Sequence, residues 1–294
     1  IVIPQKNKST KKSEKFEGAY VKDPQVGMHK WVMSFDLNSL YPHLIMQYNI
    51  SPETLVSQNK VKDMSVDKLL SQKTDTSFMK SATLTPNGAL FKTRTKGFLP
   101  EIMETMYNDR VEYKKLMLQS KQEYENTKDS KLLKDISKYN NIQMAKKISL
   151  NSAYGAIGNE HFRYYDLLVA EGITTAGQLS IRWIENKVNQ YVNKLLDTEN
   201  KDYVIASDTD SIYVTFDELV KKYNPKNTVD FLDTIAKERI EPYINKSYQE
   251  LADYTNAYDQ KMQMKREVIA DKGIWTAKKR YILNAHDVEG VRYK

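Results

Sequence analysis

Two strand-forming runs enclose a polar centre in Val204-Ile205-Ala206-Ser207-Asp208-Thr209-Asp210-Ser211-Ile212-Tyr213-Val214-Thr215-Phe216. Branched and aromatic residues favour strands, whereas the short polar residues from 207 to 211 favour a turn. The pattern predicts a β-hairpin with Asp208 and Asp210 at its tip. Two carboxylates this close repel each other unless a cation neutralises them, and hard oxygen ligands suit Mg²⁺, for which Mn²⁺ is a possible substitute. For an isolated Asp-x-Asp, an ordinary polar turn is the simpler interpretation.

Length and composition set the broad class. The 294 residues suffice for about two domains with a sizeable core. Hydrophobic residues make up 40%, mean hydropathy is −0.65, and there is no apolar run long enough for a membrane span. Cys is absent, which excludes disulfides and thiolate metal sites. Because the chain begins with Ile and has no secretory signal, we expect a piece of a longer protein, and the absence of Cys fits a reducing compartment such as the cytoplasm.

Charge is distributed unevenly along the chain. The net charge is +7, yet residues 197–218 hold seven acids and one Lys, whereas residues 92–150 hold thirteen bases and eight acids. An acidic centre beside a basic arm indicates a polyanionic partner, because Lys and Arg gain by releasing counterions from phosphates. Lysine-rich helices that are merely solvated are an equally simple interpretation of the composition.

The first hundred residues are predicted to be mixed in structure. We expect a flexible end at 1–17, a buried strand at Trp31–Asp36 and a helix at Pro42–Tyr48. A short helix at Val66–Gln72 and a small hairpin at Ala82–Thr93 follow, the latter because Thr85-Pro86-Asn87-Gly88 has turn residues.

Two long helices are predicted next. Apart from Pro100 in the first turn, Leu99–Glu125 and Lys131–Ala156 lack Gly and Pro up to Gly155, and Asn126–Ser130 is the only break between them. In an antiparallel pair, Arg110 and Lys147 lie 18 and 19 residues from Lys128, which is about 27 Å at ~1.5 Å per residue. Two stripes should therefore meet across the hairpin. They consist of Arg110 and Lys114 on one helix, and of Lys147, Asn151 and Tyr154 on the other.

The remaining chain alternates helices and strands. We predict helices at Gly172–Leu196 and Thr228–Asp253, the second interrupted near Pro242. Short strands are predicted at Val268–Ile269 and Ile274–Trp275, followed by a strand at Lys278–Leu283 that carries three cations.

Four segments in this order resemble the motifs of the family B DNA polymerases. They are Asp36-Leu37-Asn38-Ser39-Leu40-Tyr41-Pro42, Lys147-x-x-x-Asn151-Ser152-x-Tyr154-Gly155, Asp208-Thr209-Asp210-Ser211 and Lys278-Lys279-Arg280-Tyr281. The amino-acid sequences of 34–54 and 158–166 are similar to those of the replicative polymerases of the T-even phages. The resemblance runs from about Gly18 to the end of the chain.

The resemblance implies an α+β fold, with an antiparallel-sheet palm and an inserted two-helix fingers hairpin. The implied division is palm at 18–97, fingers at 98–158 and palm again at 159–294, with the family's exonuclease and thumb absent. The expected function is template-directed DNA synthesis in replication. Primer-template DNA, dNTPs, a second chain supplying the missing portion and a sliding clamp are the implied partners, with no membrane. A phage origin would place the chain in the host cytoplasm.

The resemblance assigns roles to individual residues. Asp36, Asp208 and Asp210 would be catalytic and would hold two Mg²⁺ ions together with the Leu37 carbonyl. Glu267 is a further candidate carboxylate. The implied nucleotide site comprises Ser39, Leu40, Tyr41, Arg110, Lys114, Lys147, Asn151 and Tyr154. Tyr41 would be the gate that excludes a ribose 2′-OH, and the implied DNA contacts are Gly18, Tyr20, Gly155, Lys278, Lys279, Arg280 and Tyr281.

Two other functions fit parts of the sequence. A metal-dependent glycosyltransferase also uses an Asp-x-Asp turn, but it leaves Asp36 to Tyr41 unexplained. A non-catalytic DNA-binding fragment of a split polymerase explains the positive charge but not the carboxylates. His161 has no His or Cys partner at metal-ligand spacing, so it is predicted to pack or to form hydrogen bonds.

Overall fold

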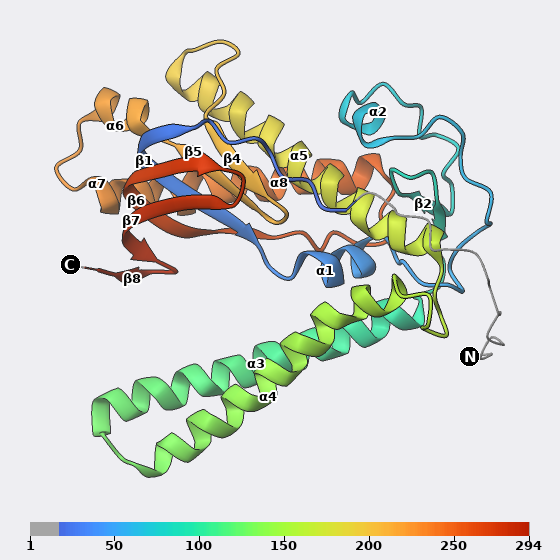
Figure 1. Ribbon diagram of the computed structural model, residues 1–294, viewed down its shortest axis with the longest axis horizontal. Helices are drawn as coiled ribbons and strands as arrows, with labels where there is room; N and C mark the ends of the chain where they lie inside the picture. Colours follow the sequence, from blue (N-terminus) through green and yellow to red (C-terminus); the bar gives the residue numbers. More distant parts are fainter. Residues whose placement is uncertain (1–17, 294) are drawn as a thin grey trace.

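A six-stranded antiparallel sheet forms the centre of the molecule (Figure 1). The computed structural model describes residues 18–293, except for the side chains of Gln122 and Glu125. The predicted flexible end at 1–17 lies outside the described residues. The strand order is β4-β5-β1-β6-β7-β8, which confirms the α+β class. The strands are β1 (Gly27–Leu37), β4 (Val204–Asp208), β5 (Ser211–Thr215), β6 (Met264–Ala277), β7 (Arg280–Val288) and β8 (Val291–Arg292).

Strands β4 and β5 confirm the predicted hairpin. The turn is tighter than expected, since only Thr209 and Asp210 lie between the strands and Asp208 still pairs with Ser211. Thr209 takes the left-handed region at a φ of 56°, the conformation that a two-residue hairpin turn requires. Asp208 is therefore held by a strand, not by a loop.

Strands β6 and β7 differ from the prediction. The two short strands expected at 268–269 and 274–275 are one strand, β6, which pairs with both β1 and β7 along its length. Lys278 and Lys279, expected on a strand, form the turn between β6 and β7, with Lys279 at a φ of 60°. The short apolar runs did not indicate so long a strand, because buried and exposed residues alternate along much of β6.

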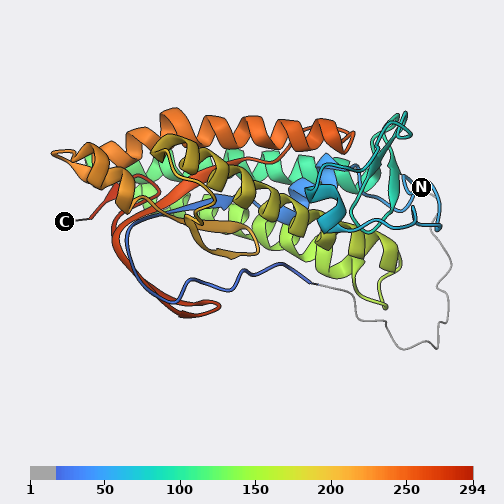
Figure 2. The ribbon, with the colours of Figure 1, turned by 90° about the horizontal axis from the view of Figure 1, so that it is seen from above.

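One face of the sheet is covered by two long helices. Helix α5 (Leu167–Leu196) contacts β4 and β5, and α8 (Glu241–Tyr254) contacts β6. The indole N–H of Trp183 on α5 donates to the Ser247 carbonyl on α8 at 2.9 Å. Figure 2 shows both helices along the sheet, with the β6–β7 hairpin extending past them. The main core lies between these helices and the sheet.

The helix predicted to break near Pro242 is continuous. Helix α7 (Thr228–Ile235) runs through one π-helical segment, Ala236–Ile240, directly into α8. Proline cannot donate the helical hydrogen bond, and its ring collides with the carbonyl four residues earlier in a regular α-helix. The wider π turn immediately before Pro242 accommodates both effects, so the chain keeps its direction.

The predicted helical hairpin is confirmed. Helices α3 (Phe98–Thr127) and α4 (Lys131–Ile157) pack antiparallel and extend away from their base beside the sheet (Figure 1). Lys146 of α4 forms an ion pair with Asp109 of α3 at 2.6 Å. Since these residues directly precede Lys147 and Arg110, the expected register of the two helices is correct.

The other predicted elements are also present. They are α1 (Leu40–Gln47), which follows β1, α2 (Val66–Leu70), β2 (Ala82–Leu84) and β3 (Leu90–Lys92). Helix α6 (Asp217–Tyr223) was not predicted. Gly88 in the β2–β3 turn has a φ of +85°, and a Cβ there would lie 2.6 Å from the Val61 carbonyl oxygen. No helix in the described part of the chain is long and apolar enough to cross a membrane.

Candidate active site

Sheet register brings together acids that are far apart in sequence. Ser211 pairs with Asp36 on one side and with Asp208 on the other. Directly opposed residues project from the same face of a sheet, so Asp36 and Asp208 share a face. The Leu37 N–H donates to the Asp210 carbonyl at 2.9 Å, which fixes the turn against the end of β1. The three predicted catalytic acids therefore lie at one end of three adjacent strands.

The electrostatics of this end favour a bound cation. Burial, with the negative charges of Asp210 and Glu267, raises the pKa of Asp36 to about 7. Burial, with Asp208 and Glu267, likewise raises the pKa of Asp210. Each shift reflects the free-energy cost of ionising a carboxyl in a poorly hydrated, negatively charged place. A cation between these groups would remove much of that cost.

The described residues do not form a closed metal cluster. Within residues 18–293, no three His, Cys, Asp or Glu side chains are arranged to hold a metal ion. Asp208 instead forms an ion pair with Lys279 at 3.2 Å and accepts a hydrogen bond from Thr209. The side chains of Asp36, Asp208 and Asp210 offer carboxylate oxygens, which are the ligands that a hard divalent cation such as Mg²⁺ prefers.

Glu267 reaches the same place because of a β-bulge. Ser34 pairs with Val268 and Phe35 with Arg266, so Glu267 is an extra residue on β6. A bulge of this kind redirects a side chain, and Glu267 lines the same cleft as Asp36. Its predicted position near the other acids is therefore correct.

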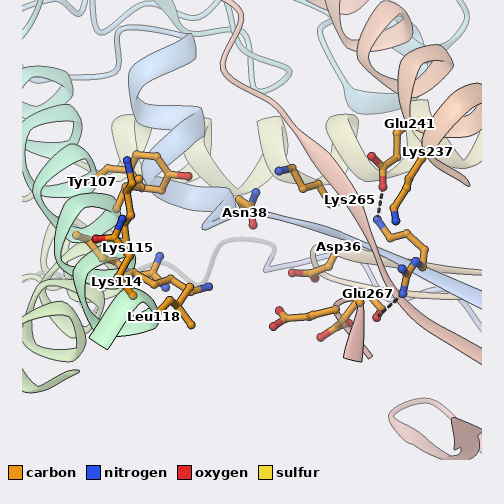
Figure 3. Close-up of a pocket in the computed structure, with 16 residues that line it drawn as sticks. Asp36, Asn38, Tyr107, Lys114, Lys115, Leu118, Lys237, Glu241, Lys265 and Glu267 are labelled. Carbon is orange, nitrogen blue, oxygen red and sulfur yellow. Dashed lines mark hydrogen bonds between the residues drawn. The ribbon is translucent and has the colours of Figure 1, made fainter. Parts of the chain in front are cut away.

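A cleft of about 860 Å³ separates the acidic end of the sheet from helix α3 (Figure 3). The charged residues of its α3 wall are all basic, namely Arg110, Lys114 and Lys115. The charged residues of its opposite wall are of both signs: Asp36, Glu241, Glu267 and Glu289, with Lys237, Lys265 and Arg266. A ligand in this cleft would contact cations on one side and carboxylates on the other.

Arg110 lies at the centre of the basic wall. Its guanidinium lies 3.5 Å from the hydroxyl of Ser39, which it contacts as a weak donor. Its Nε is buried and has no hydrogen-bond partner within the described part of the chain. A buried donor without a partner is costly, so this group is suited to an anionic ligand.

The second stripe does not line the cleft. Lys147 is exposed and lies outside the cleft lining, although its charge favours the ionised form of Asp36 and so acts to lower that pKa. Asn151 is also exposed and outside the lining. Tyr154 is outside the lining too, and its ring stacks on that of Tyr41 with centroids 4.4 Å apart.

The structure also shows the surroundings of three other residues predicted to contact the nucleotide or DNA. Ser39 has a left-handed backbone, with a φ of 52°, at the start of α1. The Leu40 side chain is buried in the core, so it presents no side-chain contact to a nucleotide. A Cβ on Gly155 would meet no atom within 4 Å, so the packing of the chain itself does not require glycine there.

The predicted DNA-contacting segments flank the acidic turn. The Tyr20 carbonyl accepts from Thr209 N–H at 3.0 Å, and the Gly18 carbonyl accepts from Gln178 at 2.6 Å. Lys278 pairs with Asp23 at 3.1 Å. Arg280 is exposed at the start of β7, and the Tyr281 hydroxyl lies 2.6 Å from that of Tyr213. Both segments therefore border the acids on the same side of β4.

The chain is similar in sequence to proteins of known family. Residues 1–290 match the family model described as DNA polymerase family B. The chain belongs to the family B DNA polymerases.

The phage members of family B are similar over nearly the whole chain. The DNA-directed DNA polymerase of Escherichia phage RB69 is 36% identical over 335 aligned residues, which cover 95% of this chain and 36% of that protein. The enzyme of Enterobacteria phage T4 is 34% identical, covering 99% of this chain and 38% of that protein. The DNA polymerase delta catalytic subunit of Candida albicans is 32% identical over 74% of this chain. The chain thus spans little more than a third of the length of its phage relatives.

Sequence reasoning missed several residues that line this family B cleft. They are Asn38, Lys115, Lys237, Glu241, Lys265 and Glu289. No strand was predicted at Lys265, and only the register of β6 against β1 shows that it lies opposite Asp36. The side chain of His161 does not pack, since it is 79% exposed, but the residue forms a hydrogen bond, because its backbone N–H donates to the Asn159 side chain at 2.9 Å.

Proposed function

We propose that this chain is the catalytic portion of a replicative DNA polymerase, which transfers dNMP from a dNTP to a primer 3′-OH under the direction of a template. One observation carries the proposal: Asp36 at the end of β1, with Glu267, faces the basic residues of α3 across a cleft of about 860 Å³, and the sheet register places Asp208 on the same face as Asp36. Phosphoryl transfer requires such opposed charges, because it depends on neutralisation and in-line placement. Family membership and the phage relatives, which are named DNA-directed DNA polymerase, support it.

In this proposal the sheet and its flanking segments, 18–97 and 159–294, are the palm, and 98–158 are the fingers. The primer 3′-oxygen forms a bond to the α-phosphorus, the bond from that phosphorus to the bridging oxygen breaks, and pyrophosphate leaves. The proton of the 3′-OH passes to water. Asp36, Asp208, Asp210 and the Leu37 carbonyl would hold two Mg²⁺ ions, which when bound supply Lewis-acid activation and charge neutralisation.

The chain's own residues would bind and orient the nucleotide. Arg110 and Lys114 already line the cleft, and Lys147 and Asn151 would join them if the α3–α4 hairpin moved toward the sheet. The buried Nε of Arg110 would then gain an acceptor. Tyr41, at the base of this wall, would exclude a ribose 2′-OH by steric clash once the Tyr154 ring separates from it.

The flanking segments would hold the primer and template. Lys278, Lys279 and Arg280 would contact phosphates without sequence preference, and Lys279 would exchange Asp208 for a phosphate when DNA binds. Gly18 and Tyr20 would lie along the template. We further propose that a thumb and exonuclease portion, a sliding clamp and a location in the host cytoplasm belong to the complete system.

Primer extension with all four dNTPs and Mg²⁺ tests the proposal. We expect Asp210→Asn to lower incorporation by about 10³-fold or more, because it removes a carboxylate from the acidic end. Asp67→Asn is the matched control, since Asp67 is exposed on α2 and pairs with Arg182. Binding of a labelled primer-template, measured by anisotropy, should be preserved in both variants.

The alternative, a partner-dependent DNA-binding fragment, makes a different prediction. If the chain binds DNA but neither it nor Asp67→Asn extends a primer, a second chain is required for activity. If extension persists in Asp210→Asn, the catalytic assignment of the acids is wrong. No support for a glycosyltransferase comes from the family match.

A further inference from the structure

The row of residues that carries the acids extends one strand further than the predicted site. Asp36 pairs with Ser211 on β5 and with Lys265 on β6. The four strands β4, β5, β1 and β6 thus align Asp208, Ser211, Asp36 and Lys265 across one face. A lysine therefore stands beside Asp36, one of the acids proposed to be catalytic.

This lysine is not neutralised by that acid. Within residues 18–293, the Lys265 ammonium has no ion pair and no hydrogen bond, although Asp36 lies directly opposite on the neighbouring strand. Lys237 and Lys261, on the same side of the molecule, do have partners, at 2.7 Å from Asp233 and 2.9 Å from Glu104. The positive charge of Lys265 is consequently available to a ligand.

Asn38 provides a second unused donor at the same place. Its backbone N–H donates to the Gln263 carbonyl at 3.3 Å, which positions it beside the start of β6. Its side-chain amide is exposed and forms no hydrogen bond with the described residues. Figure 3 shows the Asn38 and Lys265 side chains close together in the cleft, facing the α3 wall where Lys114 and Lys115 lie.

The cleft therefore has cations on both walls. Arg110, Lys114 and Lys115 belong to α3, whereas Lys265 belongs to the sheet. A polyphosphate near Asp36 and Glu267 would be repelled by these carboxylates unless cations lay close to its outer phosphates. An ammonium on a long flexible stem, with three donors, suits phosphates whose position changes during binding.

We propose that Lys265, with the Asn38 amide, binds the β- and γ-phosphates of the nucleoside triphosphate from the sheet wall. This inference rests on the proposed function and extends it, since the predicted nucleotide-binding residues all lie on the helical hairpin or at the start of α1. Because β6 is anchored in the sheet, this contact holds the triphosphate even while the hairpin stands open. The leaving pyrophosphate would retain the same contact.

Calorimetric titration of the intact chain with Mg-dATP and with dAMP tests the proposal. We expect Lys265→Met to weaken dATP binding about tenfold, the effect of one charge-assisted hydrogen bond, and to leave dAMP binding unchanged because dAMP lacks the outer phosphates. Lys265→Arg should retain most of the affinity. Lys272→Met is the matched control, since Lys272 is exposed on the same strand, outside the cleft lining.

Arg110→Met separates this inference from the proposed function. If Arg110→Met weakens dATP binding and Lys265→Met does not, the role of Lys265 is wrong and the nucleotide site stands. Equal weakening of dATP and dAMP by Lys265→Met would also overturn it, because the lysine would then act on the fold and not on the outer phosphates. If the unaltered chain binds no dATP, both inferences fail.

Discussion

The two walls of the cleft differ in how they are held. The acidic wall belongs to the sheet, where β1 is covered by neighbouring strands on both edges and by helices on one face. The basic wall belongs to the α3–α4 hairpin, in which α4 buries only Gln143, Leu150 and Ile157. By contrast, α5, of similar length, buries more than half of its residues. The acids are therefore fixed by the core, and the cations are not.

The hairpin is tied to the rest of the molecule at its base. Glu104 of α3 pairs with Lys96 and, at 2.9 Å, with Lys261, and the Tyr107 ring meets His43 edge to face at 4.4 Å. Farther along, the two helices mainly contact each other, as in the pair of Tyr113 and Tyr139. We infer that the hairpin moves as a lever about this base, while the acids stay in place.

A core substitution tests the rigidity of the acidic wall and has the largest expected effect on stability. Phe35 of β1 is 0% exposed and adjoins Asp36, whereas Ile148 of α4 is 61% exposed. We expect Phe35→Ala to lower the free energy of unfolding by about 3–5 kcal/mol, through lost burial and a cavity. Ile148→Ala should change it by less than about 0.5 kcal/mol. Urea denaturation measures both, and equal losses would show that the two walls are equally integrated.

A second prediction concerns Asp233 of α7, which forms an ion pair with Arg266 of β6. Burial opposes ionisation of Asp233, but hydrogen bonds from Lys237 and from the buried Arg266 outweigh it and lower the pKa of Asp233. Because the folded pKa lies below the unfolded one, the stabilisation is present above about pH 4 and is lost as pH falls through the folded value.

Asp233→Asn should therefore lower the free energy of unfolding by about 1–2 kcal/mol at neutral pH and by less at pH 3. Thermal melts at the two pH values measure the difference. The exposed Asp67→Asn serves as the control. A loss that is the same at both pH values would mean that the carboxylate contributes through shape alone.

The smallest expected effect concerns the contact between the two walls. Tyr154→Ala removes the stack on Tyr41, which is worth about 1 kcal/mol, so it should speed amide hydrogen exchange in the last turns of α4. Tyr139→Ala removes a ring pair inside the hairpin, at 6.3 Å from Tyr113, and is the matched control. The lever interpretation requires faster exchange near Tyr154 in the first variant only.

Several elements could be predicted from local patterns alone. The β4–β5 hairpin, both helices of the α3–α4 hairpin and helix α5 follow from strand-forming runs, helix-favouring composition and the positions of Gly and Pro. Other elements could not. The continuity of β6 and of the α7–α8 helix depends on pairing with β1 and on the π turn before Pro242, which local propensity does not encode.

The residues of the candidate site likewise divide into those that the sequence pointed to and those that only the structure shows. Residue types and spacing marked Asp208, Asp210 and Arg110 as candidates, because carboxylates at a turn and a guanidinium at helical spacing carry a chemical meaning of their own, and the family resemblance added Asp36. Lys265 and Asn38 have no such local signal, and the bulge that directs Glu267 is a property of two paired strands. Sequence by itself determined the chemical groups and the elements that carry them, since both depend on neighbouring residues. Only the tertiary structure decided which strand faces which, and hence that Lys265 lies opposite Asp36, because register is set by packing across the sheet.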